Sequence, residues 1–296
     1  MIQIMLPFRN IACRIRHLLL LCLIGTLLVV APAWAEPGKS PVRIGLPHSM
    51  FHMQYLLVAE WRQYLEIKLQ RPVQFVTHRK FSDTTVQLYG DKLDFVWITD
   101  YPDAQLKSSA RLLAVPLYKG QPYYTSYLIV PTFDTRTTSL KQLKGAVFVF
   151  ADPSPNGSYL ALRYELLMAG QNPDQFFRKT FFTRSHREVI KAVALGLANA
   201  GEVDSVVWDA LAKLRPDLAG QTRVISKSQA YGAPPLIANH FVSKEDYDDM
   251  QRVLVGMAQD PKGIDLLKRL NLDGFIPGDG RIYEHMVKMK QALDQQ

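Results

Sequence analysis

The chain has 296 residues, of which 48% are hydrophobic and 21% charged; this composition is ordinary for a globular protein and excludes a disordered chain. Its length suits one large domain or two lobes, and only 2 cysteines exclude a disulfide scaffold. The formal net charge of +8 suits an anionic small ligand or an anionic envelope surface, although a solvated basic surface is the favoured explanation. Nucleic acid is not an expected partner, because no Lys/Arg-rich cluster has interleaved aromatic residues.

The first 35 residues have the features of a secretory signal peptide. Arginines precede an apolar run at residues 18–30, and Ala33-Trp34-Ala35 is the small-x-small pattern of a cleavage site. We therefore expect cleavage after Ala35 and export to the periplasm, with an uncleaved membrane anchor as the alternative. The leader contains three arginines and no acidic residue, so its removal lowers the formal charge from +8 to +5.

Cleavage also removes every thiol, because Cys13 and Cys22 both lie in the leader. A mature chain without cysteine has no disulfide, no cysteine nucleophile and no cysteine-ligated metal. After the leader, no apolar run approaches the ~18 residues of a membrane span, so no transmembrane segment is expected after cleavage.

Short β-rich runs alternate with helical patterns along the rest of the chain. Strands are predicted at residues 42–46, 73–77, 95–99, 112–117, 126–130, 146–150, 201–207, 223–225 and 236–238. Helices are predicted at residues 54–69, 84–89, 158–169, 186–197, 243–258, 263–270 and 281–293. Gly170 is placed to end the third of these helices, and Ser185 with Glu188 has the spacing of a capping box before the fourth.

This alternation is typical of α/β units on a mostly parallel sheet. The pattern fits two α/β lobes, with the second inserted between the halves of the first. We expect residues 36–130 and 234–296 to form the first lobe and residues 131–233 the second. In such an architecture a ligand lies between the lobes, at carboxyl ends of strands and amino ends of helices.

His48 and His52 follow the first predicted strand, with Met50 and Met53 interleaved. On a helix the two histidines would share a face, and with methionine they could hold copper or a similar metal. A third ligand is not defined, so packing at the start of the helix is the favoured interpretation. A metal-binding protein remains an alternative through this pair.

Several segments, in order and spacing, resemble the periplasmic solute-binding proteins of phosphate/phosphite/phosphonate (PhnD-like) ABC transporters. The likeness extends over nearly the whole mature chain, and residues 263–286 carry its most specific part. The segments are Lys92-Leu93-Asp94-Phe95-Val96-Trp97, Ser126-Tyr127-Leu128-Ile129-Val130, Asp152-Pro153, Ser185-His186, Val203-Asp204-Ser205, Pro234-Pro235 and Leu272-Asp273-Gly274-Phe275-Ile276-Pro277 with Tyr283.

The resemblance implies a type 2 periplasmic-binding-protein (Venus-flytrap) fold, each lobe a mostly parallel sheet flanked by helices. It also implies a receptor without a cofactor that captures a small anionic or zwitterionic ligand and delivers it to an inner-membrane ABC permease. A monomer is expected. A periplasmic partner of a membrane histidine kinase is the alternative. An enzyme is not expected, because the chain has no Gly-x-Ser-x-Gly elbow and no His-Glu-x-x-His motif.

The site residues that the resemblance implies lie in loops at strand ends and helix starts. They are Thr99, Tyr101, Tyr124, Ser126, Asn156, Gly157, Ser158, His186, Asp204 and Ser205. The N-terminus of the helix at residues 158–169 offers N–H groups to an anion, although plain N-capping by Ser154 or Asn156 would explain the same residues. His186 could donate to an oxyanion or lie in a capping loop, and Asp204 could hold an amino group or cap the following turn.

Two positions depart from the family pattern. The loop after Asp152-Pro153 has Pro155 and Gly157 where the family has hydroxyl donors, and Asp100 places a negative charge in the first-lobe loop. The sequence therefore leaves open whether the ligand is a phosphorus oxyanion.

Overall fold

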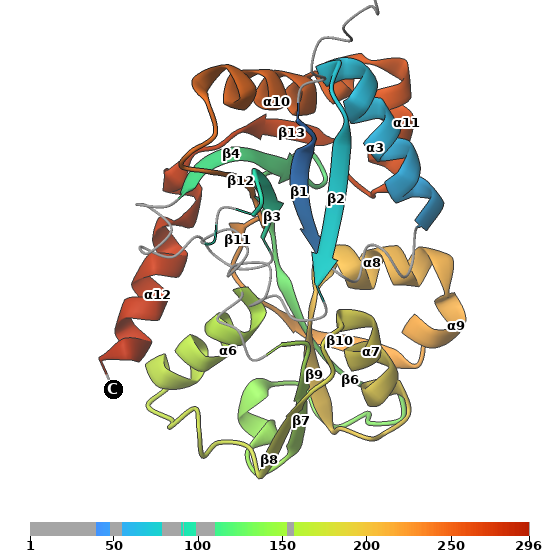
Figure 1. Cartoon of the computed structure of the whole chain (residues 1–296). Coiled ribbons are helices and arrows are strands. Elements are labelled where there is room, and N and C mark those ends of the chain that lie inside the picture. Colours follow the sequence, from blue (N-terminus) through green and yellow to red (C-terminus); the bar gives the residue numbers. More distant parts are fainter. Residues whose placement is uncertain are drawn as a thin grey trace, which may run out of the picture. The chain divides into compact units, whose positions relative to one another are not determined.

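The computed structural model describes residues 40–47, 55–78, 90, 92–98, 110–152 and 157–295. Its strands form a six-stranded sheet, a five-stranded sheet and a two-stranded pair (Figure 1). The predicted helix at residues 84–89 lies outside the described residues. Among the described residues, no helix has both the length and the apolar character that crossing a membrane requires.

The six-stranded sheet has the order β13-β4-β12-β3-β1-β2. Its strands are β1 (Val42–Pro47), β2 (Val73–His78), β3 (Phe95–Trp97), β4 (Ala110–Leu117), β12 (Leu236–Asn239) and β13 (Gly274–Pro277). β1 pairs in parallel with β2 and β3, whereas β12 is antiparallel to β3 and β4, and β13 is antiparallel to β4. The sheet is therefore mixed.

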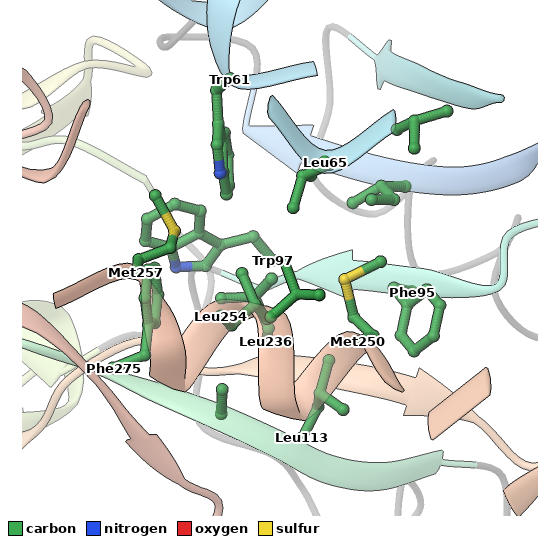
Figure 2. Packing of buried hydrophobic residues seen from close by; sticks show 14 of the residues in the cluster. Trp61, Leu65, Phe95, Trp97, Leu113, Leu236, Met250, Leu254, Met257 and Phe275 are labelled. Atoms are coloured by element: carbon green, nitrogen blue, oxygen red, sulfur yellow. The ribbon is translucent and has the colours of Figure 1, made fainter. Parts of the chain in front are cut away.

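Three helices supply the apolar side chains that cover this sheet: α3 (Tyr55–Leu69), α10 (Lys244–Gly256) and α11 (Pro261–Arg269). Figure 2 shows Trp61 of α3 and Trp97 of β3 in the resulting core. The ring centroids of these tryptophans are 5.7 Å apart in an edge-on arrangement, and Phe275 of β13 packs against Trp97 in the same way at 5.9 Å. Edge-to-face contacts of this kind add to the stabilisation that comes from burying apolar area. This core therefore packs both edge strands of the sheet against one layer of helices.

The five-stranded sheet has the order β10-β6-β9-β7-β8. Its strands are β6 (Ser126–Pro131), β7 (Val147–Phe150), β8 (Lys179–Phe182), β9 (Ala200–Asp204) and β10 (Thr222–Lys227). α6 (Gly157–Met168) lies on one face of this sheet and α7 (His186–Ala194) on the other (Figure 1). Leu162 and Leu166 of α6 belong to the core on the first face, and Val189 and Val193 of α7 to the core on the second. Because helices cover both faces, consecutive residues are buried in the three inner strands β6, β7 and β9.

A two-stranded antiparallel pair, β5 (Tyr123–Tyr124) and β11 (Tyr231–Gly232), lies where the chain passes between the two larger sheets. In sequence β5 stands between β4 and β6, and β11 stands between β10 and β12. The chain therefore leaves the six-stranded sheet just before β5 and returns to it just after β11. The remaining elements are η1 (Leu140–Leu143), α8 (Ser205–Leu214), α9 (Pro216–Ala219), η2 (Met257–Gln259), η3 (Gly280–Tyr283) and α12 (Glu284–Asp294).

Strand direction corrects one part of the sequence prediction. The expectation of mostly parallel sheets is wrong, because β6 is antiparallel to both β9 and β10 and β12 is antiparallel to both of its neighbours. β6 and β12 are the first strands after the chain passes from one sheet to the other. No helix connects either of these strands to an earlier strand of its own sheet. Successive strands of a sheet become parallel when such a helical crossover connects them.

Three local predictions also differ from the structure. The strand predicted at residues 201–207 ends at Asp204, and α8 begins at Ser205. The helix predicted to reach Leu197 ends at Ala194, and Gly196 follows with a φ of +69°, which glycine adopts without strain. Ser185 is the N-cap residue of α7, but its side chain makes no capping hydrogen bond, so the predicted capping box is not formed.

Candidate functional site

The N-terminus of α6 is the centre of the candidate site. α6 begins at Gly157, so the backbone N–H groups of its first turn have no partner within the helix. They and the helix dipole favour a negative charge at this end. Gly157 and Ser158, both predicted site residues, are buried, and Ser158 is only 4% exposed.

Gly157 is required by close packing against two tyrosines. A Cβ atom at this position would lie 2.2 Å from the Tyr124 hydroxyl and 3.4 Å from the Tyr231 ring. The two tyrosine rings pack edge-on at 6.0 Å. Tyr124 lies in β5 and Tyr231 in β11, so the paired strands between the larger sheets lie directly against the start of α6. The departure from the family at Gly157 therefore has a structural reason.

Three further predicted residues meet at the end of β9. Ser126 of β6 stands opposite Asp204 in the strand register. The Ser205 N–H donates to the Thr125 carbonyl oxygen at 2.9 Å, and the Thr125 N–H donates to Ser205 Oγ at 3.2 Å. Thr125 stands between Tyr124 and Ser126 in the chain, so these contacts join β9 to the α6 N-terminus.

His186, the first residue of α7, is tied to the same place. Its Nδ1 accepts a hydrogen bond from the Asp204 N–H at 3.3 Å. Burial lowers the pKa of His186 to about 4, although the negative charge of Asp152 acts to raise it. The imidazole is therefore neutral near pH 7, and because Nδ1 accepts, the hydrogen is on Nε2. The predicted role as a hydrogen-bond donor is chemically available to this neutral tautomer.

Asp204 has a structural role in this arrangement. Its carboxylate accepts from the Val206 N–H at 2.6 Å and so caps the N-terminus of α8. Burial raises the pKa of Asp204 to about 7, although hydrogen bonds from the α8 backbone oppose that shift. The capping alternative raised from the sequence is thus realised.

Two residues of the same region were missed by the sequence analysis. Glu202 lies on β9 and is 4% exposed, and Tyr231 lies on β11 and is equally buried. Burial raises the pKa of both groups, to about 8 for Glu202. A glutamate within the sequence Gly201-Glu202-Val203 gives no signal of burial, because only the pairing of β9 with its neighbours places it in the interior.

Five predicted residues lie outside the described part of the chain: Thr99, Tyr101, Asn156, His48 and His52, the last two forming the proposed metal pair. Asp100 and Pro155, the other departures from the family pattern, also lie outside it. Among the residues that are described, no group of three or more His, Cys, Asp or Glu side chains is placed to hold a metal ion.

A cavity of about 290 Å³ lies elsewhere, where β1 and β3 begin. Two arginines line it, and both are paired: Arg43 with Asp94 at 2.7 Å and Arg71 with Asp246 at 2.7 Å. Since these charges already neutralise each other, the cavity offers no net positive field to an anion. The α6 N-terminus is therefore the better candidate for anion binding.

Comparison with solved structures identifies the fold. XAC2383 from Xanthomonas citri, in a structure bound to chloride, has 19% identity and a TM-score of 0.72 over 87% of this chain and 100% of that chain. PA3383 from Pseudomonas aeruginosa, a binding protein component of an ABC phosphonate transporter, has 19% identity and a TM-score of 0.75 over 86% of this chain and 87% of that chain. PhnD1 from Prochlorococcus marinus, in complex with methylphosphonate, has 18% identity and a TM-score of 0.75 over 86% and 98%.

These likenesses confirm the predicted two-lobed, type 2 periplasmic-binding-protein fold. No curated protein matches the chain. The family model described as the periplasmic substrate-binding protein of phosphonate ABC transporters matches residues 52–283, which is well over half of the chain. Members of that family are transport binding proteins rather than enzymes. The chain therefore belongs to the family of periplasmic phosphonate-binding proteins of ABC transporters.

Proposed function

We propose that the mature chain is a periplasmic receptor that captures a small phosphonate-, phosphite- or phosphate-like oxyanion between its two lobes and delivers it to an ABC permease. The observation that carries the proposal is that seven residues predicted from the sequence lie at the N-terminus of α6 and at the adjoining end of β9. They are Tyr124, Gly157 and Ser158 at α6, and Ser126, His186, Asp204 and Ser205 at the end of β9. In a chain of this family, they are the described residues best placed to meet the ligand.

The chemistry of these groups favours an oxyanion. The first turn of α6 supplies N–H donors and the positive end of a helix dipole, and neutral His186 supplies an Nε2–H donor. A phosphorus oxyanion accepts several such hydrogen bonds at once, and donors fixed by backbone structure lose little entropy on binding. Burial raises the pKa of Asp204 to about 7, so below that pH its carboxyl is neutral and adds no negative charge against the anion.

The lobes of the proposed receptor would divide at β5 and β11. The strand pairings favour a first lobe built on the six-stranded sheet and a second lobe built on the five-stranded sheet that starts at β6. The boundary proposed here therefore lies near Tyr124 and Gly232 rather than after Val130. Rotation about the β5–β11 pair would close the lobes on the ligand by a hinge motion.

Calorimetric titration of the chain from Glu36 onward with methylphosphonate, phosphite, inorganic phosphate and sulfate tests the proposal. We expect at least one phosphorus oxyanion to bind, and sulfate to bind more weakly or not at all. His186→Gln should weaken that binding by about 10- to 100-fold, because a hydrogen bond to a charged group contributes about 1.5–3 kcal/mol. Glu245→Gln, at an exposed position on α10, is the matched control and should leave affinity unchanged.

Absence of binding to every phosphorus oxyanion would refute the ligand class. Delivery to a transporter is tested separately, by whether the liganded protein binds a permease in preference to the periplasmic domain of a sensor kinase.

Export is tested by expression of the full chain: the periplasmic protein should have Glu36 as its first residue by mass spectrometry. A mature chain that still contains residues 1–35 would contradict cleavage after Ala35.

A further inference from the structure

Glu202 is a buried acid that no part of the proposed function uses. Its side chain is on β9, is 4% exposed, and its Oε2 has no hydrogen-bond partner in the described part of the chain. Burying an ionised carboxylate without a partner is among the most costly arrangements in a protein, and such a group becomes neutral instead. The position therefore requires the protonated form or a ligand that compensates the charge.

The groups that face Glu202 are acidic or neutral. The Ser126 hydroxyl from β6, which donates to the Val203 carbonyl oxygen at 3.4 Å, lowers the pKa of Glu202, whereas Glu165 from α6 adds a like charge. Asp204 follows two residues later on the same strand face. From the neighbouring pair come Tyr231 and, packed on it, Tyr124. No cationic side chain of the described residues contributes to the shift that raises the pKa of Glu202 to about 8. Near pH 7 the carboxyl is thus neutral and has an O–H donor.

Tyr231 connects this carboxyl to the start of α6. Its ring lies 3.4 Å from the Cβ position of Gly157, and burial, followed by the charges of Glu202 and Glu165, raises the pKa of its hydroxyl. In the strand register Glu202 stands opposite Leu128, two residues from the pair that Ser126 forms with Asp204, and its side chain is on the same face of β9 as that of Asp204. The neutral acid is therefore close to residues that the proposed function assigns to the ligand.

We propose that Glu202 is a specificity-determining residue of this site, which admits an anion only while the Glu202 carboxyl is protonated. This inference rests on the proposed function. The neutral acid donates to an oxyanion, or accepts from a protonated one, whereas the ionised acid places an unpaired negative charge beside the α6 N-terminus and repels the ligand. Binding to the ionised protein must then take up one proton from solvent, which ends on Glu202.

The test compares the wild-type chain with Glu202→Gln from about pH 6.5 to about pH 9.5, using methylphosphonate, phosphite and inorganic phosphate as probes. Above the pKa of Glu202, we expect wild-type affinity to fall up to tenfold per pH unit relative to the variant. Because both proteins meet the same probe, ionisation of the probe itself cancels in that ratio. Calorimetry in buffers of different ionisation enthalpy should show additional proton uptake in the wild type only.

Glu165→Gln gives a second, directional test. Removing this like charge makes Glu202 easier to ionise, so the pH at which affinity falls should move downward. Exposed Glu245→Gln should leave the profile where it is. Identical pH profiles for wild type and Glu202→Gln, or for wild type and Glu165→Gln if the first variant does not fold, would overturn the inference. Failure of all probes to bind the wild type at every pH would instead overturn the proposed function.

Discussion

At Gly157, a side chain and the Tyr124 hydroxyl would compete for the same space. The Cβ atom of Gly157→Ala would lie 2.2 Å from that hydroxyl oxygen, a separation that no real contact tolerates. Tyr124 is buried between Tyr231 and α6, so the strain cannot be relieved by moving it into solvent. We expect the variant to lower the free energy of unfolding by about 1–3 kcal/mol, measured by urea denaturation.

A double variant separates this clash from any other effect of the alanine. In Gly157→Ala/Tyr124→Phe the hydroxyl is absent, and the nearest remaining ring carbon lies 3.1 Å from the new Cβ. The double variant should therefore be more stable than the sum of the two single changes implies. If the stability changes of the two single variants add strictly in the double variant, the Tyr124 hydroxyl is not the reason that position 157 requires glycine.

His186 makes stability depend on pH in a defined direction. Burial lowers the pKa of His186 from 6.5 to about 4, so in acid the unfolded chain takes up a proton before the folded one. Between those values the free energy of unfolding should fall by about 1.4 kcal/mol per pH unit as the pH decreases, and the contribution is fully present above pH 7. The asparagine side chain of His186→Asn does not titrate in this pH range. The stability difference between wild type and this variant should shrink from about pH 7 to about pH 4, and a constant difference would contradict the assignment.

At the scale of elements, the β9–α8 junction shows what a sequence pattern can and cannot predict. Residues 201–207 contain three valines, Val203, Val206 and Val207, and β-branched residues favour a strand. The chain instead changes from strand to helix at Ser205, because the Asp204 carboxylate accepts from the Val206 N–H and so supplies an N-cap. The signal was present, since Asp is a preferred N-cap residue, but the strand propensity of the valines outweighed it in the prediction.

The same junction explains which site residues were predictable. Gly157, His186 and Asp204 stand at the start of a helix or the end of a strand, where loop chemistry is visible in the sequence. Glu202 and Tyr231 are brought to them only by strand pairing across more than twenty residues of chain, and a single sequence contains no record of register. Most of the main strands and helices could thus be predicted in order, but not the edge strands β8 and β13, the helix α8, the mixed direction of the sheets or the buried acid.

Two substitutions at Asp204 separate its capping role from its charge. Asp204→Ala removes the acceptor for the Val206 N–H and should cost about 1 kcal/mol at pH 5–6. Asp204→Asn keeps an oxygen acceptor but cannot ionise. Because burial raises the pKa of Asp204 to about 7, the wild type loses stability as the pH rises from about 4 to about 7. The asparagine variant should therefore gain stability relative to wild type over that interval, as urea denaturation at several pH values would show.

At the scale of the whole molecule, one carboxylate joins elements of the two sheets. Asp209 of α8 accepts from the Tyr118 hydroxyl at 2.8 Å and from Lys119 Nζ at 2.5 Å, and both donors directly follow β4 of the six-stranded sheet. The Tyr127 hydroxyl of β6 approaches the same oxygen at 3.5 Å. This contact lies close in sequence to β5, where the lobes are proposed to divide. It should therefore couple the motions of the two lobes.

The two donors should contribute unequally. Lys119 is 65% exposed at its side chain, and an exposed ion pair contributes about 0–1 kcal/mol, so Lys119→Met should have little effect. Tyr118 is buried and burial raises its pKa to about 12, so its hydroxyl stays a donor at every accessible pH. Asp209→Ala leaves that hydroxyl without its partner and should cost about 1–3 kcal/mol. In Asp209→Ala, amide hydrogen exchange should become faster at the end of β4 and in α8 together. If Lys119→Met has an effect equal to that of Asp209→Ala, then the ion pair, and not the buried hydroxyl, couples the two sheets.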